Sequence, residues 1–388
     1  MSKASKAPKH PALTLVRVPG KKQLPQILAT GAELKSAFCL TKGNDYYVYA
    51  GIGSLDNLES LETYKNSVSR SKHLLKVEPK IISYDLHPNY MSSIFAKSLP
   101  GIRSTGYRLL SVQHHFAHIA SVLAEKQLEK SVIGFAFDGT GFGTDGKIWG
   151  GECLLWKSSK FTRLAHFDYF KLPGGDLAVK EVWRLAVSLL QFAGTNEIPA
   201  HIKKKPWKQI REMALKGINS PECCSAGRLF DAVAAIIGLK NEVSFEAQAA
   251  IELESLAVDT KVKKGYTLRS KLETRNTKLE KPLVIPTTQL IRQIWKDKKA
   301  GVSNKVIAAK FHFTLSELML NLSKQFGRKY DIKDIALSGG CFQNKILLSQ
   351  AVEKLEKSGF RVHYNQLVPV NDTCIALGQA FLATKRKS

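Results

Sequence analysis

An apolar strand that runs directly into a glycine-rich turn is the feature that most constrains the fold of this chain. The strand is predicted over residues 132–137, and residues 138–146 (DGTGFGTDG) follow it with four glycines at near-alternating positions. Glycine lets the backbone approach a ligand closely and present N–H groups to a phosphate. The same composition is also typical of an ordinary hairpin turn, so both interpretations stay open. No helix begins directly after the turn, which argues against the dinucleotide-binding GxGxxG pattern.

A second strand ends in a similar way near the carboxyl end of the chain. Residues 335–338 are predicted as a strand that leads into Gly339 and Gly340, and a helix is predicted over residues 344–358. The start of that helix would suit a phosphate, and a flat gap at the same place would suit adenine and ribose. A purely structural turn is the alternative.

Strands and helices alternate along the chain, with hairpins early in each half. Loops near Gly31 and Gly139 are of the hairpin type that binds phosphate, and helices follow both. A hairpin with its turn at residues 42–45 and a helix over residues 178–192 are among the predicted elements. The alternation predicts an α/β protein, and its weakly duplicated layout fits the two-lobed, nucleotide-binding fold of the actin/Hsp70/sugar-kinase (ASKHA) kind.

The length of 388 residues suits one large protein of two lobes. We expect a flexible basic tail over residues 1–22, a first lobe over residues 23–128 and a second lobe over residues 129–388. The second lobe carries the glycine-rich loops. A final helix is predicted over residues 375–385, and packing of this helix back on the first lobe is one of the arrangements that we consider. Residues 255–285 are charged and irregular, which predicts a surface excursion.

Three histidines in five residues, His114, His115 and His118, follow a predicted strand. On a helix, His114 and His118 share one face and are about 6 Å apart along the axis. That spacing can place two imidazoles on one metal ion. A polar helix start without a ligand is the alternative. A metal would need further ligands, and Asp138 and Asp372 could supply carboxylates.

A charged helix face is predicted after the Pro-Gly-Gly sequence at residues 173–175. Asp176, Lys180 and Arg184 repeat every four residues and would lie on one side of a helix. A solvated face is one interpretation. The other is a carboxylate, an ammonium and a guanidinium group that line a phosphate site.

The composition excludes several classes of protein. No run of about 18 or more apolar residues occurs, and the N-terminus lacks the apolar core of a secretory signal, so we expect a cytoplasmic protein without a membrane partner. The six cysteines include no CxxC pair, so we expect reduced, mostly buried thiols. The net charge of +25 comes from dispersed Lys and Arg without a nucleic-acid-binding motif. Nucleic acid is therefore not an expected partner.

Taken together and in order, these segments resemble the C-terminal portion of the HypF carbamoyltransferases. The resemblance covers residues 27–385, and ten modest motifs in sequence are highly specific. It is also distantly similar to TsaD-type tRNA-modification subunits and to O-carbamoyltransferases such as TobZ. The segments that carry the resemblance are 31–35, 85–88, 112–118, 137–152, 172–176, 225–232, 246–254, 311–312, 338–344 and 371–372.

The resemblance implies a two-lobed ASKHA fold and a role for each matching residue. The implied ligands of a divalent metal, zinc or iron, are His114, His118, Asp138 and Asp372. The residues implied to bind an adenine nucleotide (carbamoyl-adenylate, ATP or AMP) are Gly139, Thr140, Gly141, Asp176, Gly339, Gly340 and Asn344. The implied catalytic residues are His115, Lys180 and Arg228.

The resemblance also implies an activity. HypF proteins transfer a carbamoyl group from carbamoyl-adenylate to the C-terminal cysteine thiol of the partner HypE, on the way to the cyanide ligands of nickel–iron hydrogenase. The upstream domains that make carbamoyl-adenylate in this family are missing from this sequence, so we expect a separate protein to supply it. Carbamoyl transfer to a different protein or small-molecule acceptor is one alternative, and a non-catalytic, nucleotide-binding regulator is another.

Overall fold

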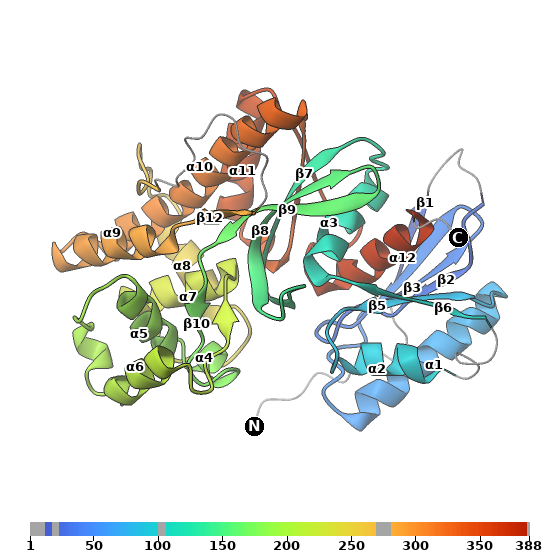
Figure 1. Cartoon of the computed structure of the whole chain (residues 1–388), viewed down its shortest axis with the longest axis horizontal. Helices are drawn as coiled ribbons and strands as arrows, with labels where there is room; N and C mark the ends of the chain where they lie inside the picture. The colour runs from blue at the N-terminus through green and yellow to red at the C-terminus, as the bar shows by residue number, and fades with distance from the viewer. Residues whose placement is uncertain (1–11, 18–22, 100–105, 269–280, 386–388) are drawn as a thin grey trace.

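Two β-sheets form the two halves of the molecule, and two helices lie between them (Figure 1). The structure is a computed structural model that describes residues 12–17, 23–99, 106–268 and 281–385. The helices at the junction are α3 (His114–Glu125) and α12 (Ile375–Lys385). The chain is therefore a two-lobed α/β protein.

Six strands form the sheet of the first lobe, in the order β1-β4-β3-β2-β5-β6. Neighbours from β1 to β2 are antiparallel, whereas β2, β5 and β6 run parallel. The hairpin predicted at residues 42–45 is confirmed as the connection between β3 and β4. The strands are β1 (Ala12–Arg17), β2 (Ile27–Ala29), β3 (Phe38–Lys42), β4 (Asp45–Ala50), β5 (Ile81–Asp85) and β6 (Arg108–Val112).

Strand β1 corrects the predicted extent of the flexible tail. The sequence predicts a tail over residues 1–22, but residues 12–17 pair with β4 along their whole length. Val16 is buried in a core that includes side chains of α3, so the strand gains apolar packing in addition to its backbone hydrogen bonds. The rest of the predicted tail lies outside the described residues.

Helices α1 (Leu58–Leu75) and α2 (Met91–Ser98) cover one face of the first sheet (Figure 1). Helix α1 begins after Asn57, whose side chain accepts a hydrogen bond from the N–H of Ser60. Tyr64 of α1 is fully buried, and its hydroxyl donates a hydrogen bond to the carbonyl of Thr30 at 2.7 Å. This bond fixes the loop that follows β2.

In the described part of the chain, eight strands form the sheet of the second lobe, in the order β10-β11-β8-β7-β13-β14, with β9 paired to β8 and β12 paired to β9. Strands β7 and β13 are parallel neighbours, so the glycine-rich segments at their carboxyl ends lie together. The strands are β7 (Val132–Phe142), β8 (Ile148–Lys157), β9 (Lys160–Phe167), β10 (Phe170–Lys171), β11 (Glu222–Cys223), β12 (Leu283–Ile285), β13 (Asp334–Ser338) and β14 (Arg361–Tyr364).

The helices of the second lobe differ in part from those predicted. The single helix predicted over residues 178–192 is split into α4 and α5, and the sequence did not predict α6, α8 or α9. The helical segments are α4 (Leu177–Lys180), α5 (Trp183–Phe192), η1 (Ala200–Ile202), α6 (Trp207–Lys216), α7 (Ala226–Ile236), α8 (Gln248–Ala257), α9 (Thr287–Lys299), α10 (Asn304–Tyr330), η2 (Gly340–Gln343), α11 (Lys345–Lys357) and η3 (Asp372–Cys374).

Helices α3 and α12 pack closely at the junction of the lobes. A Cβ atom on Gly378 of α12 would lie 1.8 Å from the carbonyl oxygen of Ala117 in α3, so only glycine fits at this contact. The next residue, Gln379, reaches the first lobe. Its side-chain oxygen accepts from the N–H of Gly31 at 2.8 Å, and its amide group donates to the Gly31 carbonyl at 3.0 Å. The final helix thus connects the loop after β2 to the rest of the molecule.

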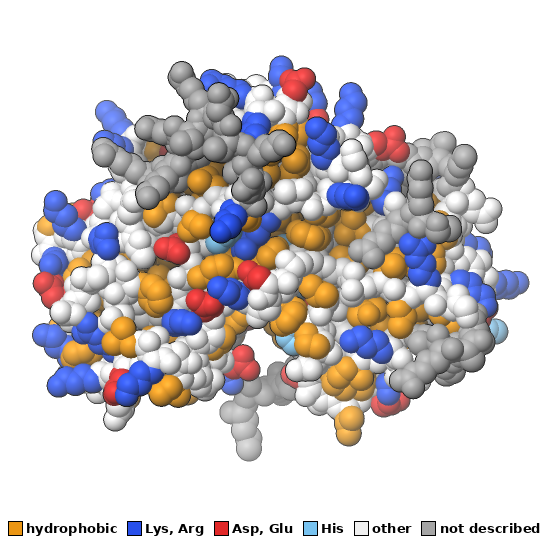
Figure 2. All heavy atoms as spheres, viewed as in Figure 1, with side chains coloured by type: hydrophobic (Ala, Val, Ile, Leu, Met, Phe, Trp, Pro, Cys, Tyr) orange, Lys and Arg blue, Asp and Glu red, His pale blue; other side chains and the backbone are white. Residues whose placement is uncertain are grey.

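The basic surface is dispersed on the face shown in Figure 2. Lys and Arg side chains lie scattered among apolar and neutral ones there, in keeping with the net charge of +25. Within the described ranges, no helix combines the length and the apolar character needed to cross a bilayer.

Candidate active site

The first turn of α3 places two histidines at the junction of the lobes. Strand β6 ends at Val112, and the side chain of Gln113 caps the helix by accepting a hydrogen bond from the N–H of Phe116 at 2.9 Å. His114 and His118 follow on this capped turn, and neither has any exposed surface. The local sequence therefore fixes both imidazoles before any ligand is considered.

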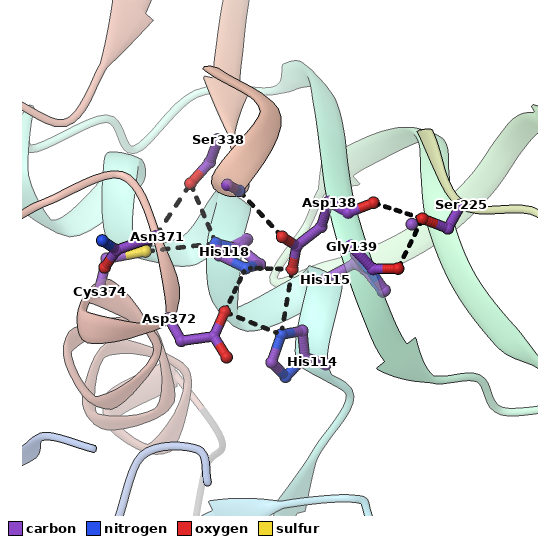
Figure 3. Close-up of polar contacts among 12 residues, drawn as sticks. His114, His115, His118, Asp138, Gly139, Ser225, Ser338, Asn371, Asp372 and Cys374 are labelled. Atoms are coloured by element: carbon purple, nitrogen blue, oxygen red, sulfur yellow. Dashed lines mark hydrogen bonds and ion pairs between the residues drawn. The ribbon is translucent and has the colours of Figure 1, made fainter. Parts of the chain in front are cut away.

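Four side chains from distant parts of the chain meet here (Figure 3). One ligand atom from each of His114, His118, Asp138 and Asp372 lies within 4.8 Å of the others. The Nε2 atom of His118 is 3.1 Å from Asp138 Oδ2 and 3.8 Å from Asp372 Oδ1. The Nε2 atom of His114 is 3.4 Å and 3.7 Å from the same two oxygens. The structure thus brings together the four residues predicted as metal ligands.

Asp85 of the first lobe orients His114. The carboxyl group of Asp85 is fully buried, and its Oδ1 accepts a hydrogen bond from the N–H of His87 at 2.9 Å. Its Oδ2 lies 2.8 Å from Nδ1 of His114. An imidazole that donates Nδ1–H to a carboxylate presents its Nε2 lone pair on the opposite side, as metal-binding histidines do.

The second lobe orients the remaining ligands. The Nδ1 atom of His118 is 3.3 Å from both Ser338 Oγ and Cys374 Sγ. The N–H of Gly340 donates to Asp138 Oδ1 at 3.0 Å. Because Ser338 ends β13 and Gly340 follows two residues later, the end of this one strand holds two ligands in place. Five of the six cysteines are buried, as predicted for most of them.

The charges of the cluster depend on one another. Burial opposes the charged form of each group, but the neighbouring carboxylates, with Asp85 first, still hold the pKa of His114 well above its ordinary value. Burial is likewise outweighed at His118, where Cys374 and Asp138 raise the pKa to about 10. The two imidazoles lower the pKa of Asp138 well below its usual range despite its burial. Two protonated histidines therefore face the ionised Asp138 when no other cation is bound.

The donor set fits a divalent metal ion. Two imidazole nitrogens and two carboxylate oxygens are a combination suited to zinc or iron(II). The Nε2 atom of His114 is buried and has no hydrogen-bond partner among the described residues. A cation between these four side chains would satisfy that nitrogen and balance the carboxylate charge.

His115 lies beside this cluster but is not part of it. Its Nδ1 is 3.1 Å from Gln113 Nε2, and its buried Nε2 has no hydrogen-bond partner in the described part of the chain. Burial, reinforced by the positive charge of His114, holds the pKa of His115 well below its ordinary value. The ring is therefore neutral, and because Gln113 Nε2 can only donate to Nδ1, the ring hydrogen lies on Nε2. The acid–base role predicted for it stays a prediction.

A cavity of 330 Å³ adjoins the cluster, and Asp138 belongs to both. Among the residues predicted at the nucleotide or the reacting group, Gly139, Gly340, Asn344 and Arg228 line this cavity. Helices α7 and α8 and the start of α11 form its walls. Lining residues that the sequence reading missed include Lys35, Phe230, Asp231, Glu246, Ile251 and Glu254.

The end of the cavity nearest the cluster is built around a glycine and an arginine. Ser225 caps α7, and its hydroxyl oxygen lies 2.6 Å from the carbonyls of both Asp138 and Gly139. A Cβ on Gly139 would lie 3.7 Å from the guanidinium of Arg228, which in turn is 3.0 Å from Asp231 Oδ2. The positive charge of Arg228 and the backbone of Gly139, which has no side chain, therefore lie beside Asp138.

The other end of the cavity has a different character. Asn344 Oδ1 accepts from the N–H of Leu347 at 2.8 Å, and Glu254 Oε1 accepts from the N–H of Lys345 at 2.7 Å. The first turn of α11 is therefore already capped, and the Glu254 carboxylate would repel a phosphate. Of the two interpretations of this segment, the structure favours the gap for a base and ribose over a phosphate at the helix start.

Four of the predicted nucleotide residues are not among the cavity-lining residues, and three of these lie close to the ends of β7 and β13. Gly141 packs against the histidines, because a Cβ there would lie 2.4 Å from His115 Cε1. Gly339 has a φ of +103° and would place a Cβ 2.3 Å from the Phe137 carbonyl, so it serves a tight turn. Thr140 lies on β7 just beyond Gly139. Close packing explains the glycine at position 141, and close packing with a positive φ explains the glycine at position 339.

The predicted placement of Asp176 and Lys180 on one helix face is wrong, whereas their roles at the site stay predictions. Both side chains are exposed, and neither lines the cavity. Helix α4 ends at Lys180, so the four-residue repeat does not continue along one helix. Arg184 instead forms an ion pair with Glu181. The charged face predicted from the spacing therefore does not exist.

An ion pair between the lobes lies at the edge of the cavity. Lys35 Nζ is 2.6 Å from both carboxylate oxygens of Glu246. The two residues belong to segments that carry the family resemblance, at 31–35 and 246–254, but nothing in the spacing shows that they meet. This contact depends on how the two lobes are placed.

Comparison with known proteins settles the family. Residues 22–125 match the family described as the HypF Kae1-like domain. Residues 134–379, more than half of the chain, match the carbamoyltransferase, Kae1-like domain, second subdomain. The chain belongs to the HypF family. The resemblance predicted from the motifs is therefore confirmed.

Relatives in the HypF family differ in how much of their length this chain covers. The chain is 35% identical over 377 residues to carbamoyltransferase HypF of Synechocystis, matching 91% of this chain and 46% of that protein. It is 34% identical over 372 residues to a HypF homolog of Cupriavidus necator, matching 93% and 92% of the two chains. The chain thus spans about half the length of the first of these relatives and nearly all of the second.

A solved structure confirms the fold. The crystal structure of full-length HypF in the phosphate- and nucleotide-bound form superposes with a TM-score of 0.86 at 38% identity. The likeness covers 97% of this chain and 48% of that one. The two-lobed ASKHA fold predicted for this HypF-family chain is therefore confirmed.

Proposed function

We propose that this chain transfers a carbamoyl group from carbamoyl-adenylate to the C-terminal cysteine thiol of a HypE-like partner, in the maturation of nickel–iron hydrogenase. One observation supports the proposal most strongly. Asp138 belongs to the four-residue cluster and also lines the cavity. A nucleotide in the cavity would therefore have its phosphate beside the cluster. Membership of the HypF family supports the class of reaction.

The phosphate end of the site combines three sources of positive potential. His114, His118, Asp138 and Asp372 would hold the divalent metal, which when bound supplies Lewis-acid stabilisation of charge on the phosphate. Arg228 adds a fixed guanidinium at the same end, held by Asp231. Gly139 allows the backbone to approach the phosphate closely.

The opposite end suits the nucleoside. Phe230 and Ile251 offer apolar surface, and Asn344 offers a polar edge. The capped start of α11 and the Glu254 carboxylate disfavour a phosphate there. These two ends support one orientation, with adenine near α11 and the carbamoyl phosphate anhydride near the cluster.

The chemistry asks little of the protein beyond positioning. Carbamoyl-adenylate is a mixed anhydride, so its carbonyl carbon is already activated for attack by a thiolate. The carbon–sulfur bond forms as the bond to the phosphate oxygen breaks, and AMP leaves. No nucleophile from this chain is required. We assign His115 the role of a hydrogen-bond donor at the site, because its Nε2 carries the ring hydrogen once Nδ1 accepts from Gln113.

Mass spectrometry of the acceptor tests this function. A HypE-like protein is incubated with the metal-loaded chain and synthetic carbamoyl-adenylate, and the terminal peptide is weighed. We expect a gain of one carbamoyl group on the cysteine with the wild-type chain and with the surface variant Asp56→Asn, but not with His118→Ala. Nucleotide binding without carbamoylation of this acceptor would contradict the proposed reaction, and would favour another acceptor or a regulatory role.

A further inference from the structure

Asn344 lies at the end of the cavity that we propose for the nucleoside, and both groups of its side-chain amide make hydrogen bonds. It is 8% exposed and lines the cavity. Its Oδ1 accepts the hydrogen bond from the N–H of Leu347 that caps α11. The amide therefore has its oxygen committed to the helix and its NH2 group turned the other way.

A buried histidine accepts one of the two hydrogens on that NH2 group. His312 of α10 has no exposed surface, and its Nε2 is 2.9 Å from Asn344 Nδ2. On the other side of the ring, Nδ1 is 2.8 Å from the carbonyl of Ala308. The ring of Phe230, which lines the cavity, packs against the ring of His312, and the two ring centroids are 5.3 Å apart. His312 thus lies directly behind the cavity wall.

These contacts define one tautomer of His312. The Ala308 carbonyl can only accept, so Nδ1 carries a hydrogen. Burial lowers the pKa of His312 to about 4, so the ring is neutral at physiological pH and Nε2 carries none. Nε2 must then accept from Asn344. The direction of every bond agrees with the oxygen of Asn344 at the helix cap.

We propose that His312 is a positioning residue, which holds the Asn344 amide so that its second N–H is a fixed hydrogen-bond donor to the nucleoside in the cavity. That N–H has no partner among the described residues. The ligand atom that it selects is an acceptor, such as a ring nitrogen of the base or a ribose oxygen. The proposal rests on the nucleotide cavity proposed above, and it adds that His312 orients the Asn344 amide in the wall of that cavity.

The reverse orientation of Asn344 is excluded by both neighbours at once. A flipped amide would turn its NH2 group toward the N–H of Leu347 and its oxygen toward the lone pair of His312 Nε2. Both hydrogen bonds would be lost. Without His312, only the helix cap would oppose rotation of the side chain.

Two substitutions of His312 separate the two ring nitrogens. Asparagine in His312→Asn places its amide near the position of Nδ1 and can keep the bond to Ala308, but removes the acceptor for Asn344. Glutamine in His312→Gln places its amide near Nε2 and can keep that acceptor. With AMP as the probe in calorimetry, we expect the Kd to rise about tenfold in His312→Asn and to stay within about twofold of wild type in His312→Gln. Equal losses in both variants, or none in either, would overturn the proposal.

Nuclear magnetic resonance of the ligand-free wild-type protein gives a readout that does not depend on the variants folding. Long-range nitrogen–hydrogen correlations of labelled histidine show which ring nitrogen is protonated. We expect the hydrogen of His312 on Nδ1 alone, and a hydrogen on Nε2 would overturn the proposal. Failure of the wild-type chain to bind AMP would instead refute the nucleotide cavity, so the two failures are distinguishable.

Discussion

Asp85 decides which nitrogen of His114 faces the cluster, although its carboxyl group is not one of the four ligands. It is fully buried and shares its two oxygens between the backbone of His87 and Nδ1 of His114. A residue of this kind sets the lone pair that a metal would meet.

Asp85→Asn should weaken metal binding without removing a ligand. The amide can donate to Nδ1 of His114, which would move the imidazole hydrogen to Nε2 and block the lone pair that faces the cluster. We expect metal affinity to fall by about 10- to 100-fold, the usual range for loss of such a partner. A competition assay with a chelator of known affinity measures this, and Asp56→Asn on the exposed surface of the same lobe is the control. Equal affinity in both variants would contradict the role of Asp85.

The pH dependence of metal binding follows from the charges of the empty cluster. The pKa of His118 is raised to about 10, and that of His114 is also raised, so both rings bind protons at neutral pH when no metal is present. A metal must displace these protons, so its affinity should increase as the pH rises from about 6 to 8, with about one to two protons released per ion. Calorimetric titration in two buffers of different ionisation enthalpy measures the release. Metal binding that takes up protons or ignores pH would contradict this account.

At the scale of elements, the contact between α3 and α12 holds the site together. Helix α3 carries His114 and His118, and α12 continues directly from η3, which begins at Asp372. The absence of a side chain at Gly378 permits the two helix backbones to touch. The spacing of three metal ligands therefore depends on one glycine.

Gly378→Ala should push these helices apart. The new Cβ would lie 1.8 Å from the Ala117 carbonyl, which is backbone and cannot move alone. We expect the free energy of unfolding to fall by about 1–3 kcal/mol, as for other overpacked sites. We also expect weaker metal binding at temperatures where the variant is folded. Thermal unfolding and the chelator competition assay check the two effects, and Gly378→Val should exceed Gly378→Ala in both. A variant as stable as wild type would refute this packing.

At the scale of the whole molecule, one exposed ion pair connects the lobes at the cavity edge. The side chains of Lys35 and Glu246 are 36% and 59% exposed, so solvent screens the pair and its contribution to stability is small. Its position still matters, because both side chains line the cavity proposed for the nucleotide.

Lys35→Glu should speed nucleotide release by about two- to five-fold, because two like charges would then face each other across the edge of the cavity. The double variant Lys35→Glu with Glu246→Lys restores opposite charges and should return the dissociation rate toward the wild-type value. Stopped-flow displacement of a fluorescent adenine nucleotide measures both rates. Equal rates in the single and double variants would show that the pair does not control exit.

The sequence predicts those parts of the site that depend on local pattern. Strand ends marked by glycine, and two histidines four residues apart, are local features of the sequence. They predict that His118 and Asp138 belong to the cluster. The partnership of Lys35 with Glu246 depends on the placement of the lobes, and no spacing contains it. Asp176 and Lys180 fail for the opposite reason. Their spacing is regular, but α4 ends at Lys180 and the shared helix face is lost.

Anomalous X-ray diffraction from crystals grown with zinc and AMP tests the central claim most directly. The account predicts one strong peak between His114, His118, Asp138 and Asp372, at ligand distances of about 2.0–2.2 Å. It also predicts the AMP phosphate at the same end of the cavity, next to Arg228. A metal peak elsewhere, or AMP with its phosphate near the start of α11, would contradict it.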